Sequence, residues 1–180
     1  MKKSTKKALK IVGLIGTSAL AAYYMIGNCF YYVTLTKNGV ENPVVAKIAS
    51  GSKNEDEEKK RLNKMMEVGK EWFNNADKEK IVIKSSNFNK NLHADYIFSE
   101  KPSNVCVIVI HGYTSSPRSM GVYAKKYHEL GYNVLMPSLN GHADSEASVV
   151  TMGWYDRLDV IDWINYLVQS DPDIKIILHG

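Results

Sequence analysis

The sequence predicts an α/β fold in which an antiparallel hairpin leads into a parallel sheet, with a membrane-spanning helix in front of both. Residues 105–110 form an unbroken apolar run, which is typical of a strand buried on both faces. His111-Gly112-Tyr113 ends this run, and Ser116-Pro117 then provides an N-cap and a first helical residue. A strand, a glycine turn and a helix form a βα unit, whose loop lies where open α/β sheets bind ligands.

The composition is that of a globular protein. With 180 residues, 44% of them hydrophobic and 23% charged, the chain is long enough for one domain with a core and an appendage. No basic stripe interleaved with aromatic residues is present, which argues against nucleic-acid binding. Cys29 lies in an N-terminal apolar run and Cys106 in the predicted strand, so the sequence does not indicate a disulfide framework.

The N-terminus has the pattern of a membrane anchor. A basic start, residues 1–10, contains five lysines and precedes an apolar segment at 11–33. This segment meets the requirement of ~20 residues for a helix that spans a bilayer. Lysines in front of a span predict a cytoplasmic N-terminus, so we expect a single-pass protein of the cell membrane with its globular part outside the cytoplasm.

A cleaved signal peptide is the alternative interpretation of the same segment. Ala19-Leu20-Ala21 resembles an A-x-A cleavage site. The apolar character continues beyond that site through residues 25–32, which favours a retained anchor. Cys29 follows Asn28, which is a poor context for a lipid anchor.

Two further segments precede the predicted sheet. Residues 34–52 show no clear period and contain several turn dipeptides, so they are predicted to be a tether. Residues 53–75 are rich in charge and place a stripe of apolar residues on one helical face, interrupted by Gly69. We expect an amphipathic helix that docks on its own domain, and a partner-binding helix is the alternative. The stripe consists of Leu62, Met65, Met66, Trp72 and Phe73.

The remaining elements follow from alternation, turns and caps. Residues 81–85 and 92–98 are predicted to pair as an antiparallel hairpin across the Asn-rich segment between them. A helix is expected over 117–130, ending at Gly131, a favourable C′ residue. A short strand at 133–136, a helix over 153–170 and a buried strand at 174–178 complete the pattern, and the helix is expected to bury Leu158, Ile161, Ile164 and Val168. The order β-β followed by β-α-β-α-β describes half of a parallel α/β sheet within a domain at 53–180.

Several kinds of site are not supported by the sequence. It contains neither the G-x-G-x-x-G pattern of dinucleotide-binding folds nor the G-x-x-x-x-G-K-[ST] pattern of P-loops. Its five histidines form no H-E-x-x-H arrangement, and its two cysteines form no C-x-x-C pair. We therefore expect no cofactor and no metal.

The turn after residues 105–110 has a chemical interpretation and a steric one. Gly112 lets the backbone turn so that the N–H of Tyr113 faces the carboxyl edge of the sheet. There the N–H could donate to a developing oxyanion, which is commonly worth a few kcal/mol of barrier. A glycine at this position can also serve the turn alone.

Four segments together resemble the α/β-hydrolase family. They are similar in particular to the membrane-anchored bacterial serine hydrolases of the serine aminopeptidase and lysophospholipase-like branch. The resemblance covers about residues 70–180. The segments are 111–117, 131–137, 140–146 and 153–163, the last containing Gly153-Trp154, Asp156-Arg157, Asp159 and Trp163.

This resemblance implies roles for particular residues. The backbone N–H of Tyr113 would form part of an oxyanion hole. The segment 139–142 resembles the Arg-Gly-His-Gly-x-Ser loop of the family, with Asn140 in place of Arg and Ala143 in place of the second Gly. These departures bear on the usual conformation and salt bridge of the loop. The residues implied to line the pocket are His111, Gly112, Thr114 and His142.

The nucleophile of this family lies in a G-x-S-x-G elbow, followed by the acid and the histidine of the triad. Residues 174–179 resemble the strand that leads into the elbow, and Gly180 matches its first glycine. Ser115, Ser116 and Ser145 lack an elbow context. We therefore expect an N-terminal fragment of a serine ester or amide hydrolase that is inactive alone, acting as a complete enzyme on a small-molecule, lipid or peptide acyl substrate.

Two other arrangements are compatible with the same residues. A separately encoded C-terminal half could complete the enzyme as a partner of this chain. Alternatively, the chain is a non-catalytic membrane-tethered binding module built on half of the hydrolase scaffold. The second arrangement would leave a sheet edge and apolar surface uncovered.

Overall fold

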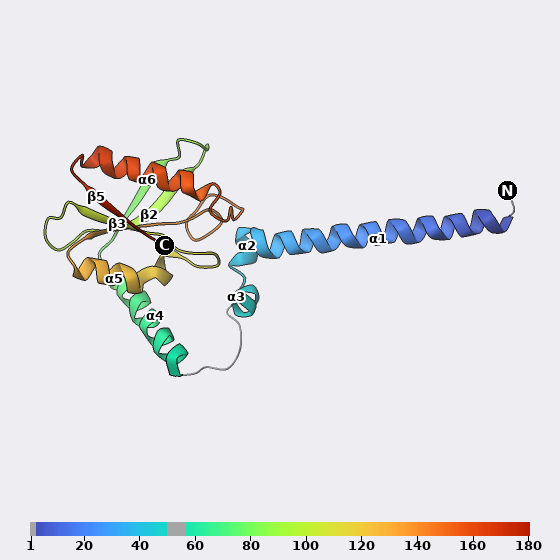
Figure 1. Ribbon diagram of the computed structural model, residues 1–180, viewed down its shortest axis with the longest axis horizontal. Helices are drawn as coiled ribbons and strands as arrows, with labels where there is room; N and C mark the ends of the chain where they lie inside the picture. The colour runs from blue at the N-terminus through green and yellow to red at the C-terminus, as the bar shows by residue number, and fades with distance from the viewer. Residues whose placement is uncertain (1–2, 50–56) are drawn as a thin grey trace.

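The computed structural model describes residues 3–49 and 57–180 (Figure 1). A long helix, α1 (Lys3–Leu35), projects from a globular part in which helices cover both faces of a five-stranded sheet. The first two residues of the predicted basic start lie outside the described residues. The same holds for 50–56, where the predicted tether meets the amphipathic helix.

The sheet has the strand order β1-β2-β4-β3-β5. β1 and β2 form an antiparallel hairpin, and β2 also pairs antiparallel with β4. β3 lies between β4 and β5 and is parallel to both, which confirms the predicted topology. The strands are β1 (Glu79–Lys84), β2 (Asn91–Ile97), β3 (Val105–Val109), β4 (Asn133–Pro137) and β5 (Lys175–His179).

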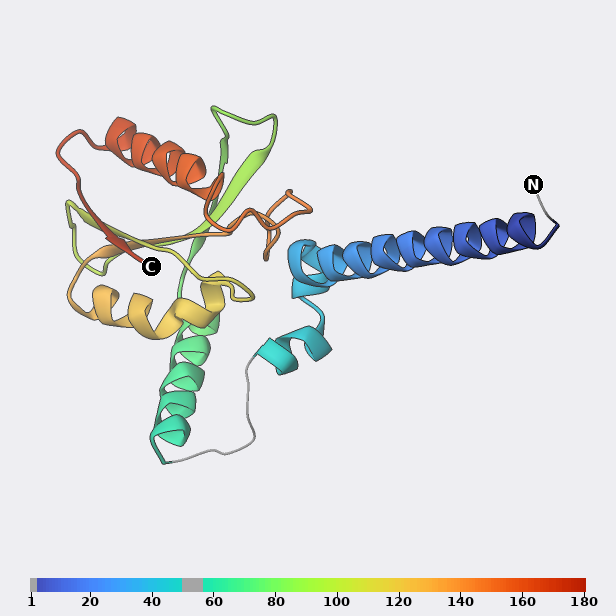
Figure 2. The same ribbon diagram turned by 45° about the vertical axis from the view of Figure 1, so that its right-hand side comes forward.

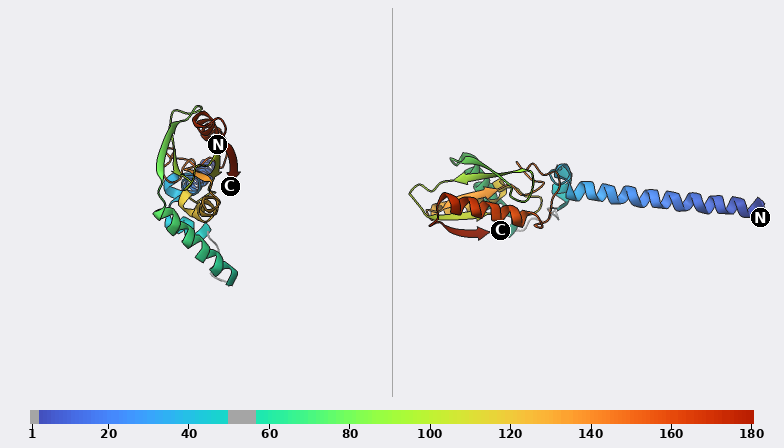
Figure 3. Two further views of the ribbon diagram at one scale, coloured as in Figure 1. Left: turned by 90° about the vertical axis from the view of Figure 1, so that its left-hand side faces the viewer. Right: turned by 90° about the horizontal axis from the view of Figure 1, so that it is seen from above.

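The core has two layers, one on each face of the sheet. Cys106 and Ile108 of β3 pack toward α6 (Asp156–Ser170) with Trp163, and the alternate residues, Val107 and Val109, pack toward the opposite face. That face is covered by α4 (Glu57–Asn75) and α5 (Gly121–Glu129), and Figure 3 shows the helices on either side of the sheet. These four β3 side chains are fully buried, so the prediction of a strand buried on both faces is confirmed.

The helix after β3 begins differently from the prediction. Pro117–Met120 form a 3-10 turn, η1, before α5 starts at Gly121. Ser116 occupies the N-cap position, but its hydroxyl lies 3.2 Å from that of Ser119 instead of capping a backbone N–H. The C-terminus matches the prediction: Gly131 has a φ of +82°, and its N–H donates to the carbonyl of His128.

The amphipathic helix docks through a shorter face than the sequence suggests. Leu62 and Met65 are exposed, whereas Gly69 and Phe73 are buried. A Cβ on Gly69 would lie 2.2 Å from the backbone nitrogen of Val122, and a Cβ on Gly121 would lie 2.2 Å from the carbonyl oxygen of Gly69. Gly69 is therefore the point where α4 crosses α5, and not an interruption of the apolar stripe.

The outer side of the α6 layer also differs from the prediction. Ile161 and Val168 are exposed, and α6 instead buries Trp163 and Leu167 together with the carboxylates of Asp156, Asp159 and Asp162. The strand β5 is an edge strand within the described residues, because it pairs only with β3. Its side chains Ile177 and Leu178 are consequently 37% and 54% exposed, although a buried strand was expected.

The predicted tether contains two short helices, α2 (Lys37–Val40) and α3 (Pro43–Ala49). Thr36 caps α2 by accepting from the N–H of Gly39 at 3.2 Å. The N–H of Lys37 donates to the carbonyl of Ser148 at 2.8 Å, and Val40 is buried. Residues 34–40 are thus docked on the globular part, because their backbone groups find partners there.

One helix among the described residues is long and apolar enough to cross a membrane. Its candidate span is Val12–Leu35, 24 residues with a mean hydropathy of 1.2, none of which is buried. The predicted span, 11–33, overlaps it almost entirely. Length and composition alone carry this observation, and a signal sequence near an N-terminus has the same properties.

Candidate functional site

The candidate site lies at the carboxyl ends of the parallel strands. The first loop, residues 110–116, follows β3, and the second loop, residues 138–155, follows β4. Between them is a largely apolar cavity of about 470 Å³. Of the sequence-predicted site residues, the cavity brings together His111, Gly112, Tyr113 and His142, but not Thr114 or Gly180. Its other lining residues are Ile110, Leu139, Val150, Met152, Gly153, Asp156, Arg157 and Val160.

Two buried histidines join the loops reciprocally. Nε2 of His111, on the first loop, accepts from the backbone N–H of Leu139 on the second loop at 3.2 Å. Nε2 of His142, on the second loop, accepts from the N–H of Thr114 on the first loop, also at 3.2 Å. The ring centroids are 5.1 Å apart. Each loop therefore presents the acceptor that satisfies a backbone donor of the other.

These contacts fix the proton on each ring. An amide N–H can only donate, so Nε2 of both rings is unprotonated and Nδ1 carries the hydrogen. Nδ1 of His111 lies 3.0 Å from the carbonyl of Gly112, and Nδ1 of His142 lies 2.9 Å from that of Asn140. Burial lowers the pKa of His111 to about 4, against the opposing effect of the Gly112 carbonyl. The neutral ring is therefore the stable form at neutral pH.

Tyr113 lines the cavity, and its backbone N–H is unpaired within the described residues. Its N–H has no acceptor among the residues that the structure describes, although its hydroxyl donates to the carbonyl of Thr34 at 2.7 Å. The left-handed residue of this turn is Thr114, with a φ of +56°, and not Gly112. A Cβ on Gly112 would meet nothing within 4 Å. Gly112, which lines the cavity, therefore has neither a left-handed backbone nor a close neighbour that requires a glycine, and the space beside it is open.

The two residues next to His142 in the second loop have a left-handed backbone conformation. Gly141 has a φ of +71°, and a Cβ there would lie 2.7 Å from the backbone nitrogen of Val150. Ala143 stands where the resembling loop has its second glycine, and it adopts a φ of +43°. An alanine in this conformation costs roughly 1–2 kcal/mol. The departure at Ala143 therefore preserves the loop conformation with some backbone strain.

A buried polar network replaces the salt bridge that Asn140 cannot make. Nδ2 of Asn140 donates to Asp156 and to Asp159, both at 2.8 Å. Lys90, from the turn of the β1–β2 hairpin, donates to the Asn140 side chain and pairs with Asp159 at 2.7 Å. Sequence reasoning missed Lys90, because 69 residues separate it from Asp159 and nothing local marks it.

Asp156 ties this network to the cavity wall. Burial by itself would raise its pKa, but hydrogen bonds from Thr151, Asn140 and Gly153 outweigh burial and hold the pKa below its usual range. The carboxylate therefore stays ionised and anchors the backbone of the second loop. Asp156 was part of the sequence resemblance, but only the folded loop shows that its carboxylate anchors the backbone of the second loop.

Gly180 lies beside the first loop, although it does not line the cavity. The N–H of Ile110 donates to the carbonyl of His179 at 2.7 Å, and a Cβ on Gly180 would lie 3.3 Å from Cβ of Ile110. The carboxyl ends of β3 and β5 are therefore adjacent. Within the described residues, no serine hydroxyl is hydrogen-bonded to a histidine, and no group of three or more His, Cys, Asp or Glu side chains could hold a metal ion.

Comparison with solved structures identifies the fold. The esterase Pf2001 of Pyrococcus furiosus aligns with a TM-score of 0.51 and 26% identity, over 57% of this chain and 42% of its own. The globular part has the α/β-hydrolase fold. An alpha-beta serine hydrolase homologue from Coxiella burnetii matches with a TM-score of 0.48 at 16% identity, over 56% of this chain and 50% of its own. A carboxyl esterase from Bacillus coagulans matches with a TM-score of 0.45 at 16% identity, over 57% of this chain and 36% of its own.

This chain spans less than half the length of the Pf2001 esterase that it matches. No protein-family model matches it, and no curated protein matches it. In the α/β-hydrolase fold, the oxyanion hole combines an N–H from a loop after one strand with an N–H next to the nucleophile elbow after another. In this chain, the loop with Tyr113 and the end of β5 lie at the carboxyl ends of two adjacent parallel strands.

Proposed function

We propose that this chain forms the N-terminal part of a membrane-anchored α/β-hydrolase that cleaves esters or amides by acyl transfer. The observation that carries the proposal is the unpaired backbone N–H of Tyr113 beside an apolar cavity. A donor held there before reaction can stabilise the oxyanion of a tetrahedral intermediate without reorganisation. The cavity walls suit the apolar part of an acyl group.

The nucleophile in this proposal is a serine two residues beyond Gly180. A G-x-S-x-G elbow that starts at Gly180 would begin next to Ile110, and so beside the Tyr113 loop. The serine oxygen would bond to the acyl carbon while the bond to the alcohol or amine breaks, and the proton that the serine hydroxyl loses would pass to the leaving group. Water would then release the acid.

The same proposal assigns α1 to the membrane. Its candidate span is unburied along its whole length, and the lysines before it favour a cytoplasmic N-terminus. Treatment of intact cells with a membrane-impermeant protease tests this assignment: we expect loss of the globular part while α1 stays in the membrane. A globular part that is protected in intact cells, or recovered without α1, would contradict the assignment.

The catalytic proposal is tested with a serine-reactive fluorophosphonate probe. The chain is expressed together with the coding sequence that follows Gly180 in its gene, and membranes are labelled. We expect Tyr113→Pro, which removes the N–H, to slow labelling by about 10²–10³-fold, while Tyr113→Phe retains it. Thermal unfolding of both variants checks their folding. The proposal fails if no reading frame there encodes the elbow, or if the probe labels nothing.

The exposed edge of β5 supports pairing with further strands, whether the enzyme is one polypeptide or two separately encoded halves. Ile177 and Leu178 leave apolar surface on a strand whose second edge has no partner in the described chain. Further strands of the same polypeptide, or a separately encoded C-terminal half, would cover that edge. Co-expression of candidate halves that restores fluorophosphonate labelling would identify the second arrangement.

A binding module is the second candidate function. It is favoured by one observation, namely that described residues of this chain alone form the apolar cavity. Binding of a fatty acid by the chain, with no labelling in the presence of the sequence beyond Gly180, would favour the module over the enzyme.

A further inference from the structure

The end of α1 contacts both loops of the site. The hydroxyl of Tyr113 donates to the carbonyl of Thr34, and the N–H of Val150 donates to the carbonyl of Leu35 at 2.8 Å. Thr36 forms an isolated antiparallel bridge with Val149. Thr34 and Leu35 are the last two residues of the candidate span. Both loops around the cavity therefore contact the helix where it would leave the bilayer.

A lysine strengthens this attachment. Nζ of Lys37 donates to the carbonyl of Ala143 at 2.5 Å and to that of Ser145 at 3.0 Å. Charge-assisted hydrogen bonds to carbonyls are stronger than neutral ones. Figure 2 shows the loop between β4 and α6 reaching toward the α1 end of the molecule, and Figures 1 and 3 agree. The docked helix thus sets which side of the globular part faces the membrane.

The rim of the cavity carries exposed apolar and aromatic side chains. Met152, which lines the cavity, is 61% exposed, and Trp154 is 65% exposed. Tyr155 is also exposed, and the guanidinium of Arg157 lies 4.1 Å from the centre of the Trp154 ring. Trp and Tyr concentrate at the interface between membrane and water, where Arg also meets anionic headgroups. Residues 152–157 have this composition.

We propose that the rim of the cavity, Met152, Trp154, Tyr155 and Arg157, is a second membrane-contacting surface, and that the cavity opens toward the bilayer. Its ligand is then the acyl chain of a lipid ester that enters from the membrane. The identity of the ligand as substrate rests on the proposed function; the contact with lipid does not. A cavity for a water-soluble ester would not require the rim to lie on the bilayer.

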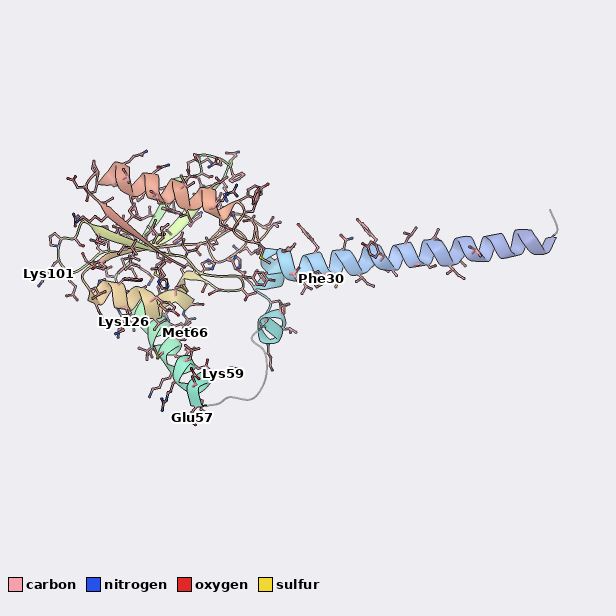
Figure 4. All side chains as sticks on the ribbon, viewed as in Figure 1. Phe30, Glu57, Lys59, Met66, Lys101 and Lys126 are labelled. Atoms are coloured by element: carbon pink, nitrogen blue, oxygen red, sulfur yellow. The ribbon has the colours of Figure 1, made fainter. Side chains whose placement is uncertain are left out.

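Tryptophan fluorescence in vesicles tests the contact. The chain has three tryptophans, Trp72, Trp154 and Trp163, of which Trp163 is buried. The whole chain is reconstituted in phosphatidylcholine vesicles that contain lipid brominated near the headgroup end of its acyl chains. We expect the W72F protein, which keeps Trp154, to lose fluorescence on bromination. The W154F protein should not, because Trp72 and Lys101 line a hollow at the end opposite α1 (Figure 4). Equal quenching in both proteins would overturn the proposal.

A photoactivatable lipid tests entry into the cavity. A phospholipid with a diazirine on its acyl chain is placed in the same vesicles, and adducts are mapped by mass spectrometry. We expect adducts on Met152 and Val150, and their loss in Lys37→Ala, which weakens docking. The matched control Lys101→Ala should keep them. Adducts confined to α1 in every variant would overturn the proposal.

These outcomes separate the inference from the catalytic proposal. Adducts in the cavity without any fluorophosphonate labelling would retain the lipid contact and reject the hydrolase. Fluorophosphonate labelling without adducts or Trp154 quenching would retain the hydrolase and reject the lipid-facing cavity.

Discussion

Individual glycines around the cavity serve different purposes, which the positions of their neighbours reveal. Gly141 has a left-handed backbone and no room for a Cβ, whereas Gly112 has free space in front of it. The sequence alone does not separate them, since both follow a buried strand within a few residues. Only the space around each α-carbon shows that the loop requires a glycine at position 141, whereas Gly112 lines the cavity beside open space.

The two glycines therefore predict opposite phenotypes. Gly141→Ala should destabilise the chain by about 2–4 kcal/mol, from backbone strain and overpacking against Val150. Gly112→Ala should change stability by no more than about 0.5 kcal/mol while it reduces acyl-ligand adducts. Urea unfolding of the full chain in detergent measures both. A larger loss for Gly112→Ala would contradict the open space beside Gly112.

His111 predicts a pH dependence at the loop contact. Because burial lowers its folded-state pKa to about 4 from 6.5, the unfolded state binds more protons between these values. Its stabilising contribution is therefore complete above about pH 6.5 and is lost as the pH falls toward 4, by about 2–4 kcal/mol. Protonation of Nε2 also removes the acceptor for the Leu139 N–H.

Hydrogen exchange checks this prediction. Corrected for intrinsic rates, the protection of the Leu139 amide should decrease between pH 6.5 and 4.5 in the wild type. In His111→Gln, protection should be lower at neutral pH and should change less across this range. Protection that is independent of pH in the wild type would contradict the neutral, hydrogen-bonded ring.

At the scale of elements, the closest helix contact depends on two glycines. Alanine is normally about 0.5–1 kcal/mol better than glycine inside a helix. At Gly69 we expect alanine to be less stable than glycine, because a Cβ would collide with α5. We expect Gly69→Ala to destabilise the chain by about 2–3 kcal/mol in urea unfolding. An increase in stability would show that α4 and α5 are not this close.

The hairpin is joined to α6 through the buried charge of Lys90. Lys90→Met should cost about 3–5 kcal/mol, because it leaves Asp159 buried without its cation. Lys84→Met, on an exposed residue of β1, is the matched control and should stay within about 0.5 kcal/mol. Similar midpoints for the two variants in urea unfolding would show that the pair is not structurally important.

Sequence patterns predicted the burial of an element correctly where other elements cover it along its whole length. They failed where only part of the element is covered. The apolar run at 105–110 predicts a strand that is buried on both faces. This prediction succeeds because helices cover both faces along the length of the strand. Ile161 and Val168 follow the same apolar pattern on α6 but remain exposed, since burial depends on what lies opposite. The site was predictable as far as one loop, while the reciprocal histidine contacts and Lys90 depend on long-range folding.

At the scale of the whole molecule, the sheet presents an uncovered apolar edge. β5 exposes Ile177 and Leu178 beside unpaired backbone groups, which is a template for pairing with other chains. Leu178→Lys should reduce self-association of the chain in detergent, as measured by analytical ultracentrifugation. If Lys101→Ala reduced association equally, the edge would not be its cause. In the proposed hydrolase, the same change should also impair pairing of the next strand.

Because β3 lies between β4 and β5, its two neighbours in the sheet are synthesised at different times. β3 is synthesised about 70 residues before the end of β5, its second neighbour in the sheet. At a translation rate of about 5–20 residues per second, one edge of β3 stays unpaired for about 4 to 14 s before β5 is synthesised. A chaperone that holds unfolded chains should therefore bind nascent chains that end before residue 175 more strongly than nascent chains that include β5.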